Sequence, residues 1–289
     1  MTTAQTTVRE AYSVCAQITR AQARNFHYGI ALLPSDRRRA LCAIYALARR
    51  IDDIGDGDLP TSTKAGALES LRAALSEVDA SSDPVLVAVA DAARRFPIPM
   101  PAFGELIDGV AMDVNGVSYA SFDNLVDYCR CVAGSIGRLC LAVFGHADEP
   151  RAATYADQLG IALQQTNIIR DVREDLLAGR VYLPQEDLDR FGVKLRLDEH
   201  GALDDPDARL AELLRHSCRR ARDWYSLGSR LLPLLDGRSR ACCLAMSGIY
   251  ASLLNRIEAD PPLVYEHRLS VSPWSKAAVA AAALAGRSR

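Results

Sequence analysis

Apolar residues recur at every third or fourth position through most of the chain. This spacing places them on one face of an α-helix, whereas no stretch shows the period of two that is typical of a half-buried strand. Helices are predicted over residues 11–26, 36–54, 65–78, 83–96, 102–114, 122–145, 151–179, 207–235 and 238–260. By usual helix lengths, the pattern predicts an all-α protein of about eight to ten helices.

Short stretches rich in Gly, Pro, Asp and Ser separate these predicted helices. They fall at residues 55–63, 79–84, 96–101, 145–150, 178–184 and 198–207. Such residues end helices and form turns. None of the stretches is long enough to be a flexible linker, and no internal repeat is found, so we expect residues 1–289 to form one domain.

Composition limits the classes of partner and compartment. The chain has 289 residues, 49% of them hydrophobic, and a net charge of -2 at pH 7, so it can bury a large core but offers no basic field for nucleic acid. Its eight cysteines show no zinc-ligand spacing, which suits reduced thiols in a cytoplasm. The alanine-rich stretch at residues 276–289 is too short to span a bilayer. We expect a cytoplasmic protein, with peripheral attachment to the inner membrane face through residues 277–289 as the alternative.

The first candidate site lies at the end of the predicted helix 36–54. Asp52 and Asp56 are four residues apart and therefore lie one above the other on one helix face, with Asp53 beside them. Like charges at this spacing destabilise an isolated helix by roughly 0.2–0.5 kcal/mol. A single such pair is usually exposed to solvent at a helix end and does not by itself indicate a site. A second occurrence in the same chain makes a functional site the better interpretation.

The second occurrence lies in the predicted helix 151–179. Asn167, Asp171 and Asp175 follow one another at four-residue spacing, with Gln164 one turn earlier. The apolar residues of this segment fall largely elsewhere around the helix, so the polar stripe runs along a segment that otherwise reads as buried. Buried carboxylates require partners.

Two such faces opposed across a helical bundle would gather carboxylates for a hard divalent cation. Mg²⁺ fits, because it binds one or two carboxylates together with waters and substrate phosphate oxygens. An EF-hand is excluded, since the third position counted from Asp52 is Ile54. Arg49 and Arg170 are placed to meet phosphate oxygens or neighbouring carboxylates. The alternative is a set of intramolecular ion pairs that binds no ligand.

These residues resemble the squalene/phytoene synthase family. The resemblance rests on five stretches in the family's order: NFHYGIALLP (25–34), YALARRIDDIGDG (45–57), YCRCVAGSIGRL (128–139), LGIALQQTNIIRDVREDLLAGRVYLP (159–184) and RLSVSPWSK (268–276). It implies a class I isoprenoid synthase fold, a single helical bundle around a central cavity, with two or three Mg²⁺ ions bound by two aspartate-rich motifs.

The resemblance also implies roles for individual residues. The metal ligands implied are Asp52, Asp56, Asn167, Asp171 and Asp175. The substrate-binding residues implied are Asn25, Phe26, Tyr45, Arg49, Gln164, Asn167, Arg170, Tyr250 and Arg268. Tyr128 matches a tyrosine of the family's cavity that takes part in proton transfer, and it completes the catalytic set with the four aspartates.

Three nearby residues bear on the cavity. Gly134 and Gly137, which are unfavourable inside a helix, are expected where a prenyl chain runs close to the backbone. Cys131 departs from the aromatic residue that many family members have at its place, which puts the shape of the cavity near the reaction centre in question.

The activity implied is magnesium-assisted ionisation of a prenyl diphosphate followed by head-to-head condensation. Residues 49–57, 91–99 and 130–145 look most like bacterial presqualene diphosphate synthases of the hopanoid pathway, so two farnesyl diphosphates are the expected substrates. Alternatives are a phytoene synthase that joins two geranylgeranyl diphosphates and a squalene synthase that uses NADPH. We do not expect NADPH, because no GxGxxG follows a predicted strand.

Two other classes of protein are compatible with parts of the sequence. A cyclising terpene synthase would share the metal and diphosphate chemistry, and a non-catalytic helical scaffold would bind neither. The partners expected are a prenyl diphosphate, a transiently contacted membrane surface and downstream pathway enzymes.

Overall fold

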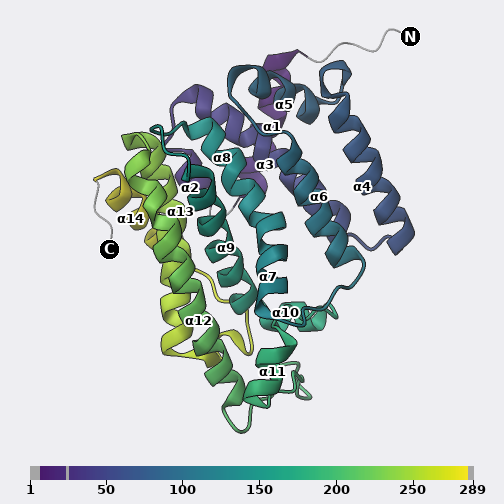
Figure 1. Cartoon of the computed structure of the whole chain (residues 1–289), viewed down its shortest axis with the longest axis vertical. Coiled ribbons are helices and arrows are strands. Elements are labelled where there is room, and N and C mark those ends of the chain that lie inside the picture. The colour runs from purple at the N-terminus through teal and green to yellow at the C-terminus, as the bar shows by residue number, and fades with distance from the viewer. Residues whose placement is uncertain (1–6, 24–25, 286–289) are drawn as a thin grey trace.

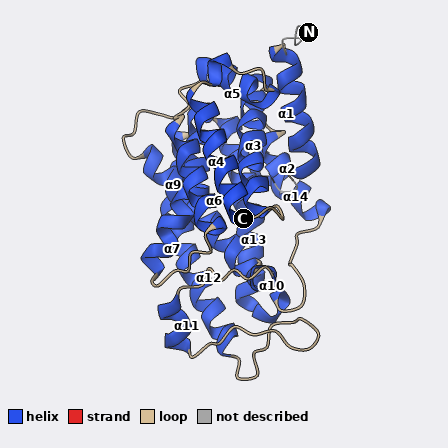
Figure 2. Ribbon diagram, turned by 90° about the vertical axis from the view of Figure 1, so that its right-hand side faces the viewer, coloured by secondary structure: helices blue, strands red, loops and turns tan. Residues whose placement is uncertain are grey.

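The computed structural model describes residues 7–23 and 26–285, and this part of the chain is helical without a β-strand. The helices pack side by side along the long axis of the molecule (Figures 1 and 2). The all-α prediction is therefore confirmed. Within the described ranges, no helix is long and apolar enough to cross a bilayer.

The first half of the chain forms one packed group of helices. Its elements are α1 (Val8–Gln22), α2 (Phe26–Ile30), α3 (Ser35–Asp56), α4 (Thr61–Ser76), η1 (Val78–Ala80), α5 (Pro84–Arg95) and α6 (Pro101–Val114). Side chains start two of them, because Thr7 and Glu10 form a capping box at α1 and Asp83 accepts from the main-chain N–H groups of Val85 and Leu86 at α5. Helix α3 ends at Asp56, two residues beyond the predicted end and within the predicted breaker stretch 55–63.

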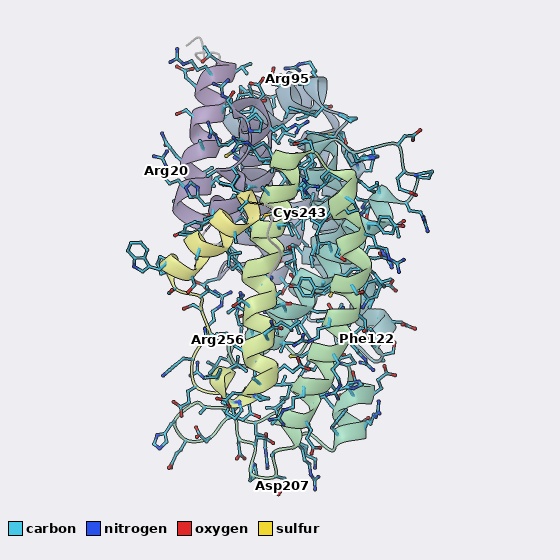
Figure 3. All side chains as sticks on the ribbon, turned by 90° about the vertical axis from the view of Figure 1, so that its left-hand side faces the viewer. Arg20, Arg95, Phe122, Asp207, Cys243 and Arg256 are labelled. Atoms are coloured by element: carbon cyan, nitrogen blue, oxygen red, sulfur yellow. The ribbon has the colours of Figure 1, made fainter. Side chains whose placement is uncertain are left out.

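The second half wraps around a central helix. Its elements are α7 (Phe122–Cys129), η2 (Arg130–Gly134), α8 (Ser135–Phe144), α9 (Ala152–Arg170), α10 (Val172–Leu177), α11 (Gln185–Phe191), α12 (Arg209–Gly228), η3 (Ser229–Leu234), α13 (Gly237–Ala259), η4 (Pro261–Val264) and α14 (Pro273–Leu284). Helix α9 packs against α8, η2, α12 and α13. Figure 3 shows α14 beside α13 on the outer surface.

Glycines allow α9 to approach its neighbours at backbone contact. A Cβ at Gly160 would lie 2.3 Å from the carbonyl oxygen of Ala133, and one at Gly137 would lie 2.4 Å from that of Ala156. At Gly134 it would meet the Asp157 carboxylate at 2.9 Å. The expectation that Gly134 and Gly137 make room for a prenyl chain is therefore wrong, because α9 fills the space beside both.

The predicted helix 151–179 is broken at one residue. Asp171 leaves the helical conformation, with φ -102° and ψ 12°, between α9 and α10. The main-chain N–H of Asp171 still donates to Asn167, and that of Asp175 donates to Asp171, both at 2.8 Å. Asn167, Asp171 and Asp175 thus remain on consecutive turns although the helix does not continue through them.

Two apolar cores flank the middle of the molecule. One is built mainly by α1, α3, α5, α6 and α8, and the other by α7, α9, α12 and α13. All eight cysteines are free thiols, and six of them are buried.

Candidate functional site

The structure brings the two acidic segments together. Arg180, which follows α10, forms an ion pair of 3.1 Å with Asp56 at the end of α3. Asp113 on α6 lies close to both, since its charge acts on Asp52 and on Asp175. Residues more than 100 positions apart in the sequence, Asp56 and Arg180, therefore meet at one place.

One carboxylate from each acidic segment has no partner. The side chains of Asp52 and Asp175 are partly buried, and neither is hydrogen-bonded or ion-paired to any residue that the structure describes. Burial, followed by the field of neighbouring carboxylates at Asp175, raises the pKa of Asp175 to about 7. Burial likewise raises the pKa of Asp52 to about 7. Such unpaired groups are costly unless a ligand compensates them.

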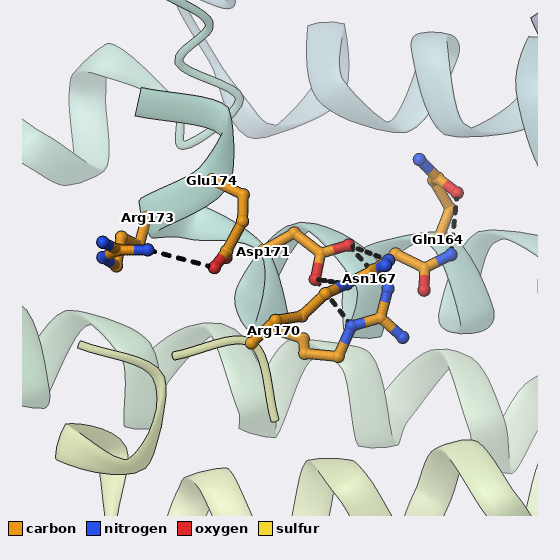
Figure 4. Close-up of polar contacts among 7 residues, drawn as sticks. Gln164, Asn167, Arg170, Asp171, Arg173 and Glu174 are labelled. Carbon is orange, nitrogen blue, oxygen red and sulfur yellow. Dashed lines mark hydrogen bonds and ion pairs between the residues drawn. The ribbon is translucent and has the colours of Figure 1, made fainter. Parts of the chain in front are cut away.

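Asp171 is in the opposite situation. Its two oxygens accept bidentate hydrogen bonds from Arg170, at 2.6 and 2.5 Å, and from Arg268, at 2.9 Å for both. Figure 4 shows the Arg170 contact next to Asn167 and Gln164. Burial alone would raise the pKa of Asp171, but hydrogen bonds from the two guanidinium groups outweigh it and hold the pKa below its ordinary value.

Other polar atoms around the site lack partners. Arg49 pairs with Asp53 at 2.6 Å, yet its Nε is buried without an acceptor, as is Nε of Arg180. Asn167 donates to Gln164 at 3.3 Å, while its own Oδ1 is buried without a donor or cation. Ion pairs thus satisfy only part of the site. The unpaired atoms are donors that suit an anion and oxygens that suit a cation.

Aromatic residues predicted to line the site also lie together. The ring of Phe26 is 6.4 Å from that of Tyr45 and 5.9 Å from that of Tyr250. The guanidinium of Arg170 lies 6.0 Å from the centre of the Tyr250 ring, so this wall adjoins the Asp171 cluster. Asn25, which is predicted to accompany Phe26, is outside the described residues.

Tyr128 belongs to a cluster with residues that the sequence did not single out. Its hydroxyl donates to Asp113 at 2.8 Å, and the Tyr182 hydroxyl donates to the other oxygen of Asp113 at 2.7 Å. The rings of Tyr128 and Tyr182 stack at 5.2 Å, and Tyr119 packs on both. Arg180 and Tyr182 lie in the stretch AGRVYLP, which reads from sequence as a helix breaker. Asp113 belongs to no acidic pair at four-residue spacing on its helix and gives no sequence signal.

The described residues contain no group of three or more His, Cys, Asp or Glu side chains that could hold one metal ion. The arrangement instead brings the end of α3, with Asp52 and Asp56, to the segment of Asp171 and Asp175 through the ion pair of Asp56 with Arg180. This donor set matches cations that share their ligands with a bound polyanion.

Comparison with known proteins identifies the family of the chain. Residues 19–275 match the model of the squalene/phytoene synthase family. The chain belongs to this family of head-to-head prenyl transferases.

Its relatives share most of its length. A phytoene synthase from Mycobacterium tuberculosis is 59% identical over 97% of this chain and 92% of its own. A phytoene synthase from Arthrospira platensis is 34% identical over 92% of this chain and 90% of its own.

Solved structures share the fold. A dehydrosqualene synthase in complex with a ligand superposes with a TM-score of 0.84 at 25% identity, covering 96% of this chain and 97% of its own. The squalene synthase HpnC from Alicyclobacillus acidocaldarius superposes with a TM-score of 0.76 at 27% identity. The match covers 87% of this chain and 94% of the HpnC chain. The expected class I isoprenoid synthase fold is confirmed.

Proposed function

We propose that this prenyl transferase acts as a phytoene synthase, joining two geranylgeranyl diphosphates head to head through a cyclopropyl diphosphate intermediate. The names of relatives support this choice, since the mycobacterial protein at 59% identity is a phytoene synthase. Presqualene diphosphate formation, which the sequence stretches favoured, has weaker support than this alternative.

Farnesyl diphosphate remains the second candidate substrate. A specific observation favours it, because a dehydrosqualene synthase and a squalene synthase are among the solved structures that share this fold. Those likenesses are at 25% and 27% identity, so they carry less weight for substrate choice than the 59% relative.

The unpaired carboxylates of Asp52 and Asp175 are the observation that carries the proposal. Together with the unpartnered Oδ1 of Asn167 they fit Mg²⁺, which would be held by Asp52 and Asp56 on one side and by Asn167, Asp171 and Asp175 on the other. When bound, Mg²⁺ would supply positive charge that stabilises the departing diphosphate.

The chain's own residues would orient and ionise the substrate. Arg49, Arg170 and Arg268 have guanidinium groups that can bind diphosphate oxygens bidentately, with Gln164 alongside. As the diphosphate departs, the rings of Phe26, Tyr45 and Tyr250 would face the allylic cation, attract it through their π-systems and keep water away. The double bond of the second prenyl chain then attacks, and loss of a proton closes the cyclopropane.

The test is product analysis. Purified protein is incubated with Mg²⁺ and either geranylgeranyl or farnesyl diphosphate, with and without NADPH, and the products are identified by mass spectrometry. Phytoene from geranylgeranyl diphosphate, unaffected by NADPH and abolished by a chelator, is expected. Presqualene diphosphate as the preferred product would move the assignment to the farnesyl substrate.

Two outcomes would remove the proposed chemistry altogether. A cyclic hydrocarbon formed from a single substrate molecule would indicate a cyclase, and no magnesium-dependent binding of diphosphate would indicate a scaffold. Asp175→Asn should lose activity by orders of magnitude, whereas Asp58→Asn, at an exposed position beyond α3, should keep it.

A further inference from the structure

Asp113 is the shared acceptor of two tyrosine hydroxyls. It lies on α6, its partner Tyr128 lies on α7, and Tyr182 lies in the loop after α10. The two O–H···O distances are 2.8 and 2.7 Å, and each tyrosine uses a different carboxylate oxygen. The hydrogen bonds of this carboxylate are thus to tyrosines, not to the proposed metal ligands.

The surroundings of Asp113 favour a proton acceptor. The charged groups that act on it include Arg180, which favours its ionised form, and Asp56, Asp52 and Asp175, which oppose it. Burial is the largest influence and raises the pKa of Asp113 above its ordinary value, so the carboxylate binds a proton more readily than an exposed one would. Tyr128 and Tyr182 are both buried, which shields the cluster from bulk water.

The Tyr128 hydroxyl is not a base by itself. Burial, and then the Asp113 charge, raises its pKa well above the ordinary value of tyrosine, so the group is a neutral phenol. A neutral phenol can accept a proton on its oxygen only while its own proton leaves. In this structure that proton already points at Asp113.

We propose that Tyr128 and Asp113 form a proton relay in which Asp113 is the terminal acceptor. This inference rests on the proposed function. A C–H bond breaks on the carbon that lies two bonds from the cationic carbon, and its electron pair joins these two carbons to close the cyclopropane ring. The released proton bonds to the Tyr128 oxygen, the original hydroxyl proton moves to Asp113, and the carboxyl returns it to solvent between turnovers. One cation and one carboxylate become a neutral ring and a neutral carboxyl group.

A double-mutant cycle tests the relay. Asp113→Asn keeps the shape and one acceptor oxygen but cannot take the proton, and Tyr128→Phe removes the hydroxyl. Each should lower kcat by about 10²-fold or more, with less change in KM, since the loss is in a proton-transfer step. The combined variant should be no slower than Tyr128→Phe alone. If the two losses multiply instead, Asp113 acts independently of Tyr128 and the relay is wrong.

Tyr182→Phe distinguishes proton transfer through Tyr128 from structural support of Asp113 by Tyr182. It removes the second hydrogen bond of Asp113 but leaves the Tyr128 contact, so we expect a loss in kcat of less than about tenfold. A loss as large as that of Tyr128→Phe would overturn the assignment of the relay to Tyr128.

A measurement without substrate or metal provides an independent readout. With the tyrosines labelled at the ring carbon that bears the hydroxyl, Asp113→Asn should shift the NMR signals of Tyr128 and Tyr182, identified by their loss in the phenylalanine variants. The matched control is Asp91→Asn, because Asp91 accepts from Tyr12 at 2.9 Å far from the site. It should move the Tyr12 signal only. Unmoved Tyr128 and Tyr182 signals in Asp113→Asn would contradict the geometry on which the relay depends.

The outcomes distinguish the inference from the proposed function. If the wild-type protein forms no condensation product from either prenyl diphosphate, the proposed function fails. If it forms product and the cycle is multiplicative, only the relay fails.

Discussion

Arg268 holds Asp171 from the far end of the chain. The two residues are 97 positions apart, and both nitrogen–oxygen distances between them are 2.9 Å. Arg170 occupies the other side of the same carboxylate. Two guanidinium groups therefore pair with a proposed metal ligand, and these groups would have to turn toward the diphosphate when it binds.

Arg268→Ala tests whether Arg268 turns from Asp171 to the diphosphate. The Arg268 side chain is 57% exposed, so its removal should cost less than about 1 kcal/mol of folding stability. Binding of inorganic diphosphate with Mg²⁺, measured by calorimetry, should weaken by about tenfold because a charge-assisted contact is lost. The matched control is Arg256→Ala, which removes a contact to the Ser270 carbonyl in the same loop. Equal weakening in both variants would show that the loop, not the guanidinium, matters.

Asp52→Asn should stabilise the metal-free protein at neutral pH. The pKa of Asp52 is raised from 3.8 to about 7, so between these values the folded state holds a proton that the unfolded state has lost. The contribution of this group to stability therefore falls as pH rises from about 4 to about 7, approaching 1.4 kcal/mol per pH unit.

Urea unfolding in the presence of chelator measures this effect. Between pH 5 and pH 7 the free energy of unfolding of Asp52→Asn should rise relative to that of the wild type. The variant should nevertheless lose its activity. Asp53→Asn, the exposed neighbour, should show no such gain. A pH-independent difference between Asp52→Asn and wild type would contradict the raised pKa.

Binding of Mg²⁺ with diphosphate should tighten as pH rises from 6 to 8. Asp52 and Asp175, whose pKa values are both raised to about 7, must be deprotonated to ligate the ion. Calorimetry in two buffers of different ionisation enthalpy should detect proton release. Diphosphate itself also changes protonation over this pH range. The proton release of the wild type is therefore compared with that of Asp175→Asn, which should release fewer protons. Equal release in the two proteins would remove Asp175 from the site.

Gly160→Ala should destabilise the fold strongly. The added Cβ would lie 2.3 Å from a carbonyl oxygen and 2.6 Å from a carbonyl carbon of Ala133, and main chain cannot yield as a flexible side chain can. A loss above about 2 kcal/mol is expected from overpacking. Gly66→Ala in α4 meets nothing within 4 Å and should instead gain roughly 0.5–1 kcal/mol. Thermal unfolding compares the two variants.

The long helices could be predicted because their signal is local. The end of α3, with Asp52 and Asp56 on its last turns, follows directly from periodicity and the breaker after it. The two acidic segments are predicted to face each other because buried carboxylates need partners, and the family resemblance names the same residues. In the structure the ion pair of Asp56 with Arg180 joins them.

The remaining features depend on tertiary contacts. The break at Asp171 has no glycine or proline to announce it, and the residue is instead held by Arg268 from a distant loop. Asp113 becomes notable only when Tyr128 and Tyr182 reach it from two other elements. The sequence predicts the wrong role for Gly134 and Gly137, because it indicates that space is needed there but not which element fills it.

The tight seating of α9 limits how this protein can diversify. The middle of the helix touches neighbouring backbone at Gly160, and its last turns carry Gln164, Asn167 and Arg170 into the site. Few of its positions are free to vary without loss of either packing or chemistry. New chain-length preferences would therefore arise more readily through the rings on surrounding helices, such as Phe26 on α2 and Tyr250 on α13, and libraries aimed at altered products should be built there.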